Sequence, residues 1–129
     1  MQPVKSVENV LEEIILDQFV KEAQVQSVSI VSKTGLMVAG KPAPLSRAET
    51  FSAMAAIIYS SAESVRSDNA KDKVDHVVVS FKTSKMLICE VSSSLLIVVT
   101  ADISADDRTI LDGMQKVITR TKEELVWLR

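Results

Sequence analysis

Apolar residues recur at helical spacing in three segments of the chain, 6–22, 46–66 and 104 to the end. In each segment they return every three or four positions, which gathers them on one side of a helix. Each segment opens on a serine that can accept a hydrogen bond from a first-turn backbone N–H group. An acidic residue follows two of these serines three positions later, Glu49 and Asp107, and completes a capping pair. We therefore predict three helices.

Shorter apolar segments lie between the predicted helices and have the length of strands. They cover residues 24–32, 36–39, 74–81, 86–91 and 95–101. The last two are joined by three serines and the first two by Lys33-Thr34-Gly35, whose glycine can adopt a positive φ. Links this short join antiparallel neighbours. The runs 77–79 and 96–99 do not alternate, so we expect a sheet that is covered on both faces.

The order of elements predicts an α/β (α+β) fold in a single domain, residues 1–129. Five antiparallel strands follow the order α-β-β-α-β-β-β-α, with the first and last helices on one face and the middle helix on the other. Five strands spaced by ~4.8 Å form a sheet about 24 Å wide, which one helix cannot cover. We therefore expect a second copy of the chain to supply another helix on that face.

The middle helix has apolar residues on more than one side. Phe51, Met54 and Ile58 form one stripe, with alanines beside it, and the sector around Ser52 is polar. A second flank is small or apolar, and consists of Ala53, Ile57 and Ser61. One interpretation is that this helix packs on the sheet and on a second copy of itself. The alternative is that the small flank contacts a neighbouring element of the same chain.

Composition excludes several classes of function. The formal net charge is −2, so no basic field attracts nucleic acid or anionic lipid, and aromatic residues are only 4%. The longest apolar run, residues 95–99, is far shorter than the ~20 residues that span a bilayer. The amino terminus lacks the layout of a signal peptide, so we expect a cytoplasmic protein that is not inserted in a membrane.

Candidate catalytic and metal-binding residues are few. The chain has no P-loop motif, and its three glycines are far apart. Cys89, the single cysteine, fits a buried inert thiol better than a nucleophile, and His76 fits a partly exposed polar residue. Helix capping explains the carboxylates Asp102, Asp106 and Asp107 more simply than a metal site does. We expect no catalytic residues, no cofactor and no metal.

Three stretches together resemble the roadblock/dynein light chain family, of the type that regulates Ras-like GTPases in prokaryotes. They are residues 28–40, 48–64 and 95–110: a hairpin before the middle helix, an alanine- and methionine-rich helix, and a last strand leading into the final helix. The resemblance implies a homodimer or heterodimer in which the middle helices pair antiparallel and the strand at 74–81 joins that of its partner. It also implies a non-enzymatic scaffold that binds a small Ras-like GTPase and regulates it.

The predicted dimer interface follows from this resemblance and from the middle helix. It consists of Phe51, Met54, Ala55, Ile58, Tyr59, Ala62, His76 and Val78. Two other functions stay open at this point. Related α/β sheets hold ligands, so the chain could be a small-molecule-sensing or longin/profilin-like binding domain. An enzyme would require turnover that depends on His76 or Cys89.

Overall fold

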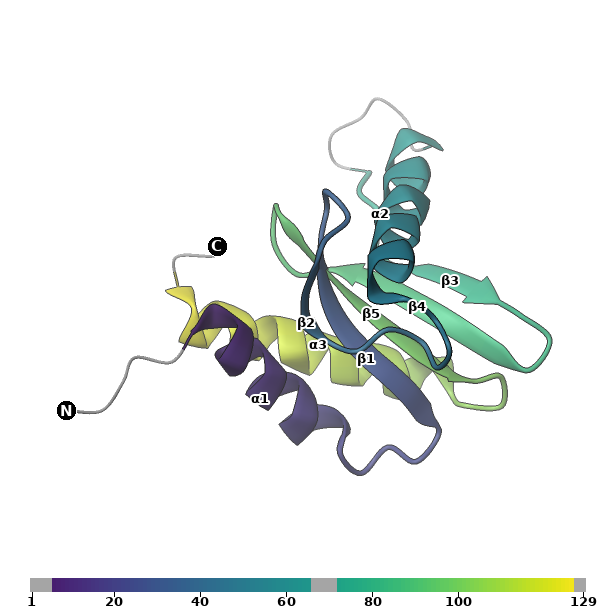
Figure 1. The fold of residues 1–129 in the computed structure, drawn as a ribbon, viewed down its shortest axis with the longest axis horizontal. Helices are drawn as coiled ribbons and strands as arrows, with labels where there is room; N and C mark the ends of the chain where they lie inside the picture. Colours follow the sequence, from purple (N-terminus) through teal and green to yellow (C-terminus); the bar gives the residue numbers. More distant parts are fainter. Residues whose placement is uncertain (1–5, 66–71, 127–129) are drawn as a thin grey trace.

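A computed structural model describes residues 6–65 and 72–126 (Figure 1). The elements are α1 (Val7–Phe19), β1 (Val25–Ser32), β2 (Met37–Gly40), α2 (Ala48–Val65), β3 (Val77–Ser80), β4 (Ser84–Glu90), β5 (Leu95–Asp102) and α3 (Asp107–Glu124). The strands form one antiparallel sheet in the order β2-β1-β5-β4-β3. This confirms the predicted α+β fold and its order of elements.

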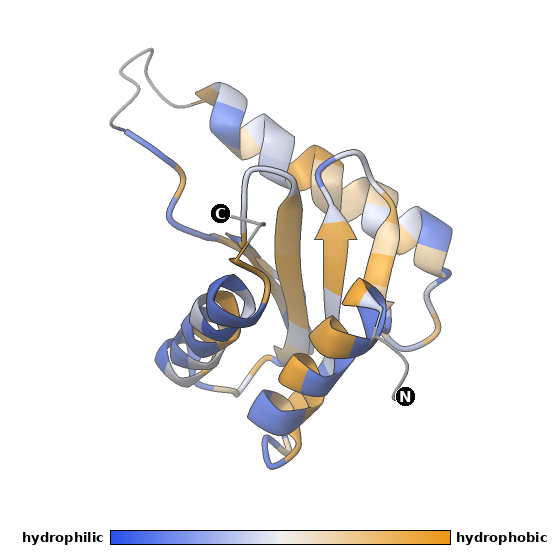
Figure 2. Ribbon diagram, turned by 90° about the vertical axis from the view of Figure 1, so that its left-hand side faces the viewer, coloured by the Kyte–Doolittle hydropathy of each residue, from blue (hydrophilic) through white to orange (hydrophobic). Residues whose placement is uncertain are grey.

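The sheet separates two hydrophobic layers, as the sequence predicted. α1 and α3 lie side by side on one face, and α2 crosses the other (Figures 1 and 2). Successive residues of β4 serve both layers: Leu87 and Cys89 join the α1–α3 side, whereas Met86 and Ile88 join the α2 side. Because neighbouring side chains of a strand point to opposite faces, a strand buried on both faces is apolar throughout.

The amino-terminal cap of α1 is as predicted, but those of α2 and α3 are not. Ser6 accepts a hydrogen bond from the Asn9 N–H group over 3.2 Å. α2 begins at Ala48, and the Arg47 carbonyl accepts the first helical hydrogen bond, from the Phe51 N–H. Arg47 is therefore the cap residue, and the predicted capping pair of Ser46 and Glu49 lies one residue too early.

The cap of α3 is Asp106 rather than Ser104. The Asp106 carboxylate accepts a hydrogen bond from the Thr109 N–H over 3.0 Å. Ser104 instead donates its own N–H to the Asp102 carboxylate over 2.9 Å, which closes the turn that leaves β5. Two acidic residues in succession, at 106 and 107, made the cap position ambiguous from sequence.

The two edges of the sheet are short strands. β2 and β3 have four residues each, and β3 covers only residues 77–80 of the predicted strand at 74–81. β2 ends at Gly40, whose φ is +82°, and a Cβ atom there would lie 2.2 Å from the Val28 carbonyl oxygen. Only glycine fits this approach of the β2 end to β1.

Candidate protein-interaction surface

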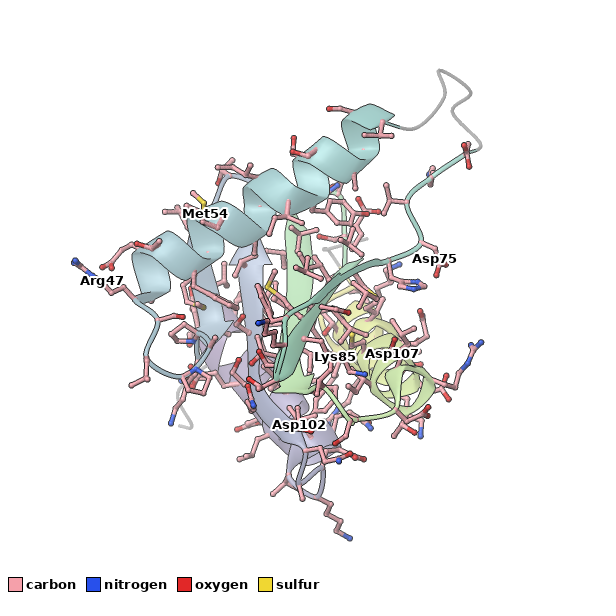
Figure 3. The ribbon with its side chains drawn as sticks, turned by 90° about the vertical axis from the view of Figure 1, so that its right-hand side faces the viewer. Arg47, Met54, Asp75, Lys85, Asp102 and Asp107 are labelled. Atoms are coloured by element: carbon pink, nitrogen blue, oxygen red, sulfur yellow. The ribbon has the colours of Figure 1, made fainter. Side chains whose placement is uncertain are left out.

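α2 covers one side of its face of the sheet and leaves the other side open. It packs most closely on β1 and β2 and crosses the sheet (Figure 3). A groove of about 800 Å³ opens between the amino-terminal half of α2, the start of β4 and the residues that follow β3. Apolar side chains line much of this groove: Phe51, Met54, Ile58, Phe81 and Met86. The opening lies where the sequence predicted that one helix would be too narrow for the sheet.

Large apolar side chains are exposed beside the groove. Met54 is 48% exposed and Ile57 is 55% exposed; we call these two residues the α2 ridge. Phe81, at the end of β3, is also 55% exposed. A buried side chain of this size contributes about 1.5–3 kcal/mol relative to an exposed one. Large patches of exposed apolar surface are typical of sites that bind other proteins or ligands, so this region is a candidate interaction surface.

The predicted interface residues of α2 do not all lie on its outer side. Met54 is exposed, and Phe51, Ile58 and Ala62 are half-buried. Ala55 and Tyr59 are 1% and 2% exposed, because they already pack on the sheet of the same chain. A substitution at either of the two would therefore test folding rather than association.

α2 is rotated relative to the sequence prediction, and the turn at 33–35 explains the rotation. Ser52, predicted to lie in the polar sector, is buried, and its hydroxyl lies 2.8 Å from the carbonyl oxygens of both Gly35 and Ala48. The Gly35 backbone packs against Ala53, so this part of the small flank contacts a neighbouring element of the same chain. Lys33 lies 5.6 Å from the Tyr59 ring centre and 3.9 Å from the Glu63 carboxylate. Sequence periodicity treats a serine as a surface residue and cannot reveal such contacts.

β3 forms the edge of the sheet beside the groove. Val77 and Val79 pack toward the α2 layer, while Val78 alternates to the α1–α3 side and is 36% exposed. His76 precedes the strand, is exposed, and its Nδ1 lies 2.6 Å from an Asp75 carboxylate oxygen. The structure thus places the predicted residues His76 and Val78 at the open edge, on the opposite face of the sheet from the α2 ridge.

The side chains considered as candidate catalytic or metal-binding groups, Cys89, Asp102 and Asp106, are in surroundings that fit structural roles. Burial, with a smaller effect from the Asp75 charge, raises the pKa of the Cys89 thiol to about 11, so the thiol stays protonated at neutral pH. Hydrogen bonds from Ser104 lower the pKa of Asp102, and hydrogen bonds from Thr109 lower the pKa of Asp106. Within residues 6–65 and 72–126, no group of three or more His, Cys, Asp or Glu side chains could hold a metal ion.

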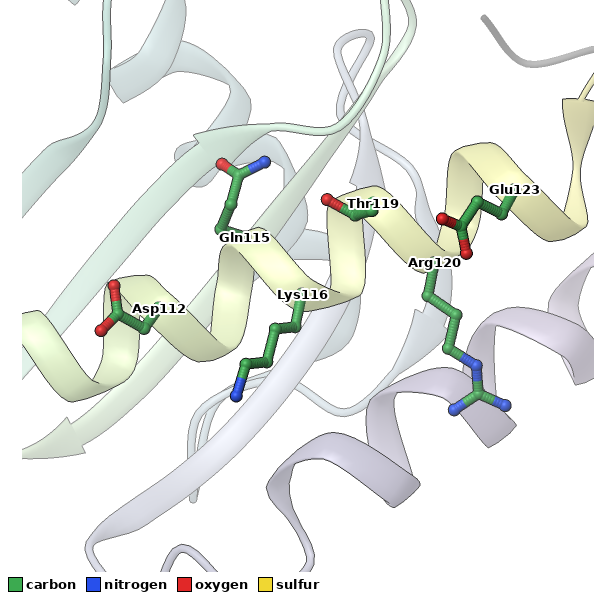
Figure 4. Close-up of a pocket in the computed structure, with 6 residues that line it drawn as sticks. All are labelled: Asp112, Gln115, Lys116, Thr119, Arg120 and Glu123. Atoms are coloured by element: carbon green, nitrogen blue, oxygen red, sulfur yellow. The ribbon is translucent and has the colours of Figure 1, made fainter.

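A second hollow lies along α3 alone. Its lining is polar and comes entirely from the outer side of that helix: Asp112, Gln115, Lys116, Thr119, Arg120 and Glu123 (Figure 4). Arg120 reaches away from it to Asp17 on α1, with Nη1 2.8 Å from the carboxylate. All of these side chains come from one side of one helix, so they do not surround a space in which a ligand could be held, and we assign the hollow no function.

Comparison with known proteins identifies the family. A sequence model of the Roadblock/LC7 domain matches residues 11–101. The chain belongs to the Roadblock/LC7 domain family. This confirms the resemblance found in the sequence. No curated protein has a matching sequence.

Solved structures share this fold at low sequence identity. MglB of Myxococcus xanthus has a TM-score of 0.81 at 9% identity, over 100% of this chain and 97% of that one. A Roadblock/LC7 domain from Streptomyces avermitilis has a TM-score of 0.79 at 18% identity, over 89% and 97% of the two chains. Profilin IA of Acanthamoeba castellanii has a TM-score of 0.59 at 13% identity, over 88% and 97%.

Two exposed apolar residues of this candidate surface are not among the predicted interface residues, which remain a prediction. Ile57 belongs to the second flank of the middle helix and is exposed, and Phe81 lines the groove. Phe81 ends an apolar strand just before a two-residue turn, so its aromatic side chain was a signal available in the sequence. No helix among the described residues has both the length and the apolar character needed to cross a membrane.

Proposed function

We propose that this chain is a non-enzymatic scaffold that works as a dimer and binds and regulates a small Ras-like GTPase. Family membership supports this function, since the Roadblock resemblance implies a GTPase-binding platform. MglB, a gliding protein in Thermus thermophilus, has the same fold. The observation that carries the proposal is the exposed α2 ridge beside an apolar groove and an open sheet edge.

A second copy fits this surface by simple symmetry. A two-fold axis perpendicular to the sheet, beside β3, makes the two β3 strands antiparallel neighbours and extends the sheet across both chains. The same axis makes the two α2 helices antiparallel. Met54 and Ile57 lie near the middle of α2, so each ridge would pack against the other helix and beside the other copy's groove. The apolar surface that is now exposed would then be buried.

The scaffold would regulate the GTPase by shifting the equilibrium between the conformations that the GTPase itself adopts. The chain has no P-loop, and the thiol of Cys89 is protonated and buried, so it offers neither a nucleotide site nor a reactive nucleophile. A scaffold of this kind alters hydrolysis or exchange only by binding one nucleotide state of the GTPase more tightly than the other. The proposal therefore requires unequal affinity for the two states.

The test is a binding and hydrolysis assay with a small Ras-like GTPase from the same organism, loaded with GDP or with a GTP analogue. We expect the chain to bind one state at least about tenfold more tightly and to change the rate of hydrolysis or exchange. Met54→Asp, which charges the ridge, should lose this effect together with dimerisation. Leu16→Asp, on the exposed side of α1, is the matched control and should retain both. Equal binding of both states, with unchanged rates, would refute the regulatory function.

A ligand-binding role is the second candidate, and the same groove would hold the ligand. Profilin IA has a similar fold, but at 13% identity this likeness concerns the fold alone. The groove is bordered by exposed side chains, Met54 and Phe81, rather than enclosed. Mass spectrometry of the denatured protein would favour this role if it found a stoichiometric small molecule that purifies with the chain.

A further inference from the structure

The backbone and side chain of Lys33 connect three elements at one end of the molecule. Lys33 belongs to the β1–β2 turn, which lies beside the β4–β5 turn, and its N–H donates to the Ser94 carbonyl over 2.9 Å (Figure 1). Its side chain reaches Tyr59 and Glu63, which are one turn apart in the carboxyl-terminal half of α2. This half of α2 is therefore joined to both turns through a single residue.

The Lys33 ammonium group lies between two carboxylates from different elements. It donates a hydrogen bond to Glu90, the last residue of β4, and lies 3.9 Å from a carboxylate oxygen of Glu63 on α2. It also lies 5.6 Å from the ring centre of Tyr59, within the range of a cation–π contact. Without this cation, the like charges of Glu63 and Glu90 would stay close together and repel. Lys33 therefore holds this half of α2 close to the end of β4.

The amino-terminal half of α2 is held by a different contact from the same turn. The buried Ser52 hydroxyl lies 2.8 Å from the Gly35 carbonyl oxygen. At 1.5 Å per residue, Glu63 lies about 16 Å farther along the helix, and the α2 ridge is between the two attachment points. Release of the Lys33 contact would therefore let α2 tilt about Ser52, and the ridge would move with it.

We propose that Lys33 is a positioning residue that holds α2 in the orientation required for binding the small GTPase. This inference rests on the proposed function, in which the α2 surface of the paired chains forms the platform for that GTPase. The tilt of α2 sets the shape of this platform. Lys33 acts through the helix and need not touch the GTPase itself.

Tyr59 offers a direct readout of the position of α2, because it is the only tyrosine in the chain. Its side chain is buried in the layer between α2 and the sheet, next to Lys33. A chain produced with 3-fluorotyrosine therefore carries one fluorine label, and its fluorine NMR spectrum should contain one line for each position that α2 occupies.

Two substitutions of Lys33 test the proposal. Lys33→Met removes the cation and keeps most of the aliphatic chain, whereas Lys33→Arg keeps the cation. We expect the fluorine line of Lys33→Met to shift or to split in two, and that of Lys33→Arg to stay close to the parent line. The affinity of Lys33→Met for the preferred nucleotide state of the GTPase should fall at least about threefold, because only chains with α2 in place bind it tightly. If two lines appear, the fraction of intensity left at the parent position should match the fraction of affinity that remains.

Two further variants separate positioning from general stability. Glu63→Gln removes only the α2 partner of Lys33 and should move the fluorine line in the same direction by a smaller amount. Lys116→Met, at an exposed position of α3, is the matched control and should change neither the line nor the affinity. The urea midpoints should all stay near that of the parent chain, since partly exposed ion pairs add little to stability.

The outcomes distinguish this inference from the proposed function. An unchanged fluorine line in Lys33→Met would overturn the inference, and so would a changed line with unchanged affinity for the GTPase. Either result leaves the proposed function intact. Equal binding of both nucleotide states by the parent chain would instead contradict the proposed function, and with it the role of Lys33 in regulation.

Discussion

At the scale of single residues, the buried Lys85 shows how one charge fixes the start of a helix. Its ammonium group donates to the Ala105 carbonyl and pairs with the Asp107 carboxylate, just before and at the start of α3 (Figure 3). A buried carbonyl or charge without a partner is costly, so the lysine ties the β5–α3 turn to β4. The sequence offered only a polar residue at the start of an apolar strand.

Replacing this lysine should destabilise the fold without affecting association. Lys85→Met keeps most of the aliphatic chain but leaves the Ala105 carbonyl without its donor, so we expect a loss of about 1–3 kcal/mol. Urea unfolding at a fixed protein concentration measures it. Lys116→Met, an exposed lysine on α3, is the control and should change stability by less than about 0.5 kcal/mol. Equal stability of the two variants would show that the buried contact contributes nothing.

The cap of α3 should make stability depend on acidic pH. Hydrogen bonds from Thr109 lower the pKa of Asp106 in the folded chain. A lowered pKa gives stability that is present above the unfolded-state pKa of about 4 and is lost as the pH falls through the folded-state value. Asp106→Asn still accepts the Thr109 hydrogen bond but cannot titrate. Its urea midpoint should therefore fall less between pH 5 and pH 2.5 than that of the parent chain, and an equal fall would contradict the assignment.

At the scale of elements, hydrophobic spacing predicted the existence and order of all the helices and strands, but not how α2 is rotated. Periodicity identifies an apolar side, and α2 has apolar or small residues on most of its circumference. The turn at 33–35 lies against the side of α2 that carries Ser52, where the Ser52 hydroxyl is 2.8 Å from the Gly35 carbonyl oxygen. Contacts between segments so far apart in sequence are invisible to local patterns. For this reason the sequence could not show that Ala55 and Tyr59 are buried against the sheet while Ile57 and Phe81 are exposed.

The strand boundaries illustrate the same limit. The valine-rich segment at 74–81 has the composition of a strand throughout, yet the strand β3 covers only Val77–Ser80. A partner strand is required for pairing, and sequence alone does not show where β4 ends. Which residues of this segment form the free edge strand can therefore be seen only in the folded sheet.

The edge of β3 can be tested by proline, which lacks an N–H group. The Phe81 N–H donates to the Ser84 carbonyl of β4, so by the alternation of an antiparallel ladder Val79 and Val77 bond to β4 and the Val78 N–H points outward. Val78→Pro should therefore leave the pairing with β4 intact while dimer formation is lost. Val79→Pro removes an N–H that bonds to β4 and should lower the stability of the chain by at least about 2 kcal/mol. Circular dichroism and urea unfolding compare the folds, and light scattering compares the masses. A stable dimer of Val78→Pro would exclude this edge from the interface.

At the scale of the whole molecule, the two faces of the sheet are covered unequally. α1 and α3 together cover most of one face, with Leu11, Ile30, Leu87 and Met114 fully buried between the layers. A pocket of about 410 Å³ stays open between α1 and the edge strands on this face. On the other face α2 is the only helix within residues 6–65 and 72–126, and the α2 ridge and Phe81 are exposed. A binding partner that buries the apolar side chains and also pairs with the free edge of β3 must present both a helix and a strand. A second copy of the chain offers both.

The mass of the unmodified chain in solution tests this account most directly. Multi-angle light scattering during size-exclusion chromatography, at micromolar concentration, should give twice the chain mass of 14.1 kDa. The dimer should persist in high salt, because its proposed contacts are apolar side chains and backbone hydrogen bonds rather than exposed charges. A folded species of 14.1 kDa across the micromolar range would contradict the account, since the open face would then be stable without a partner.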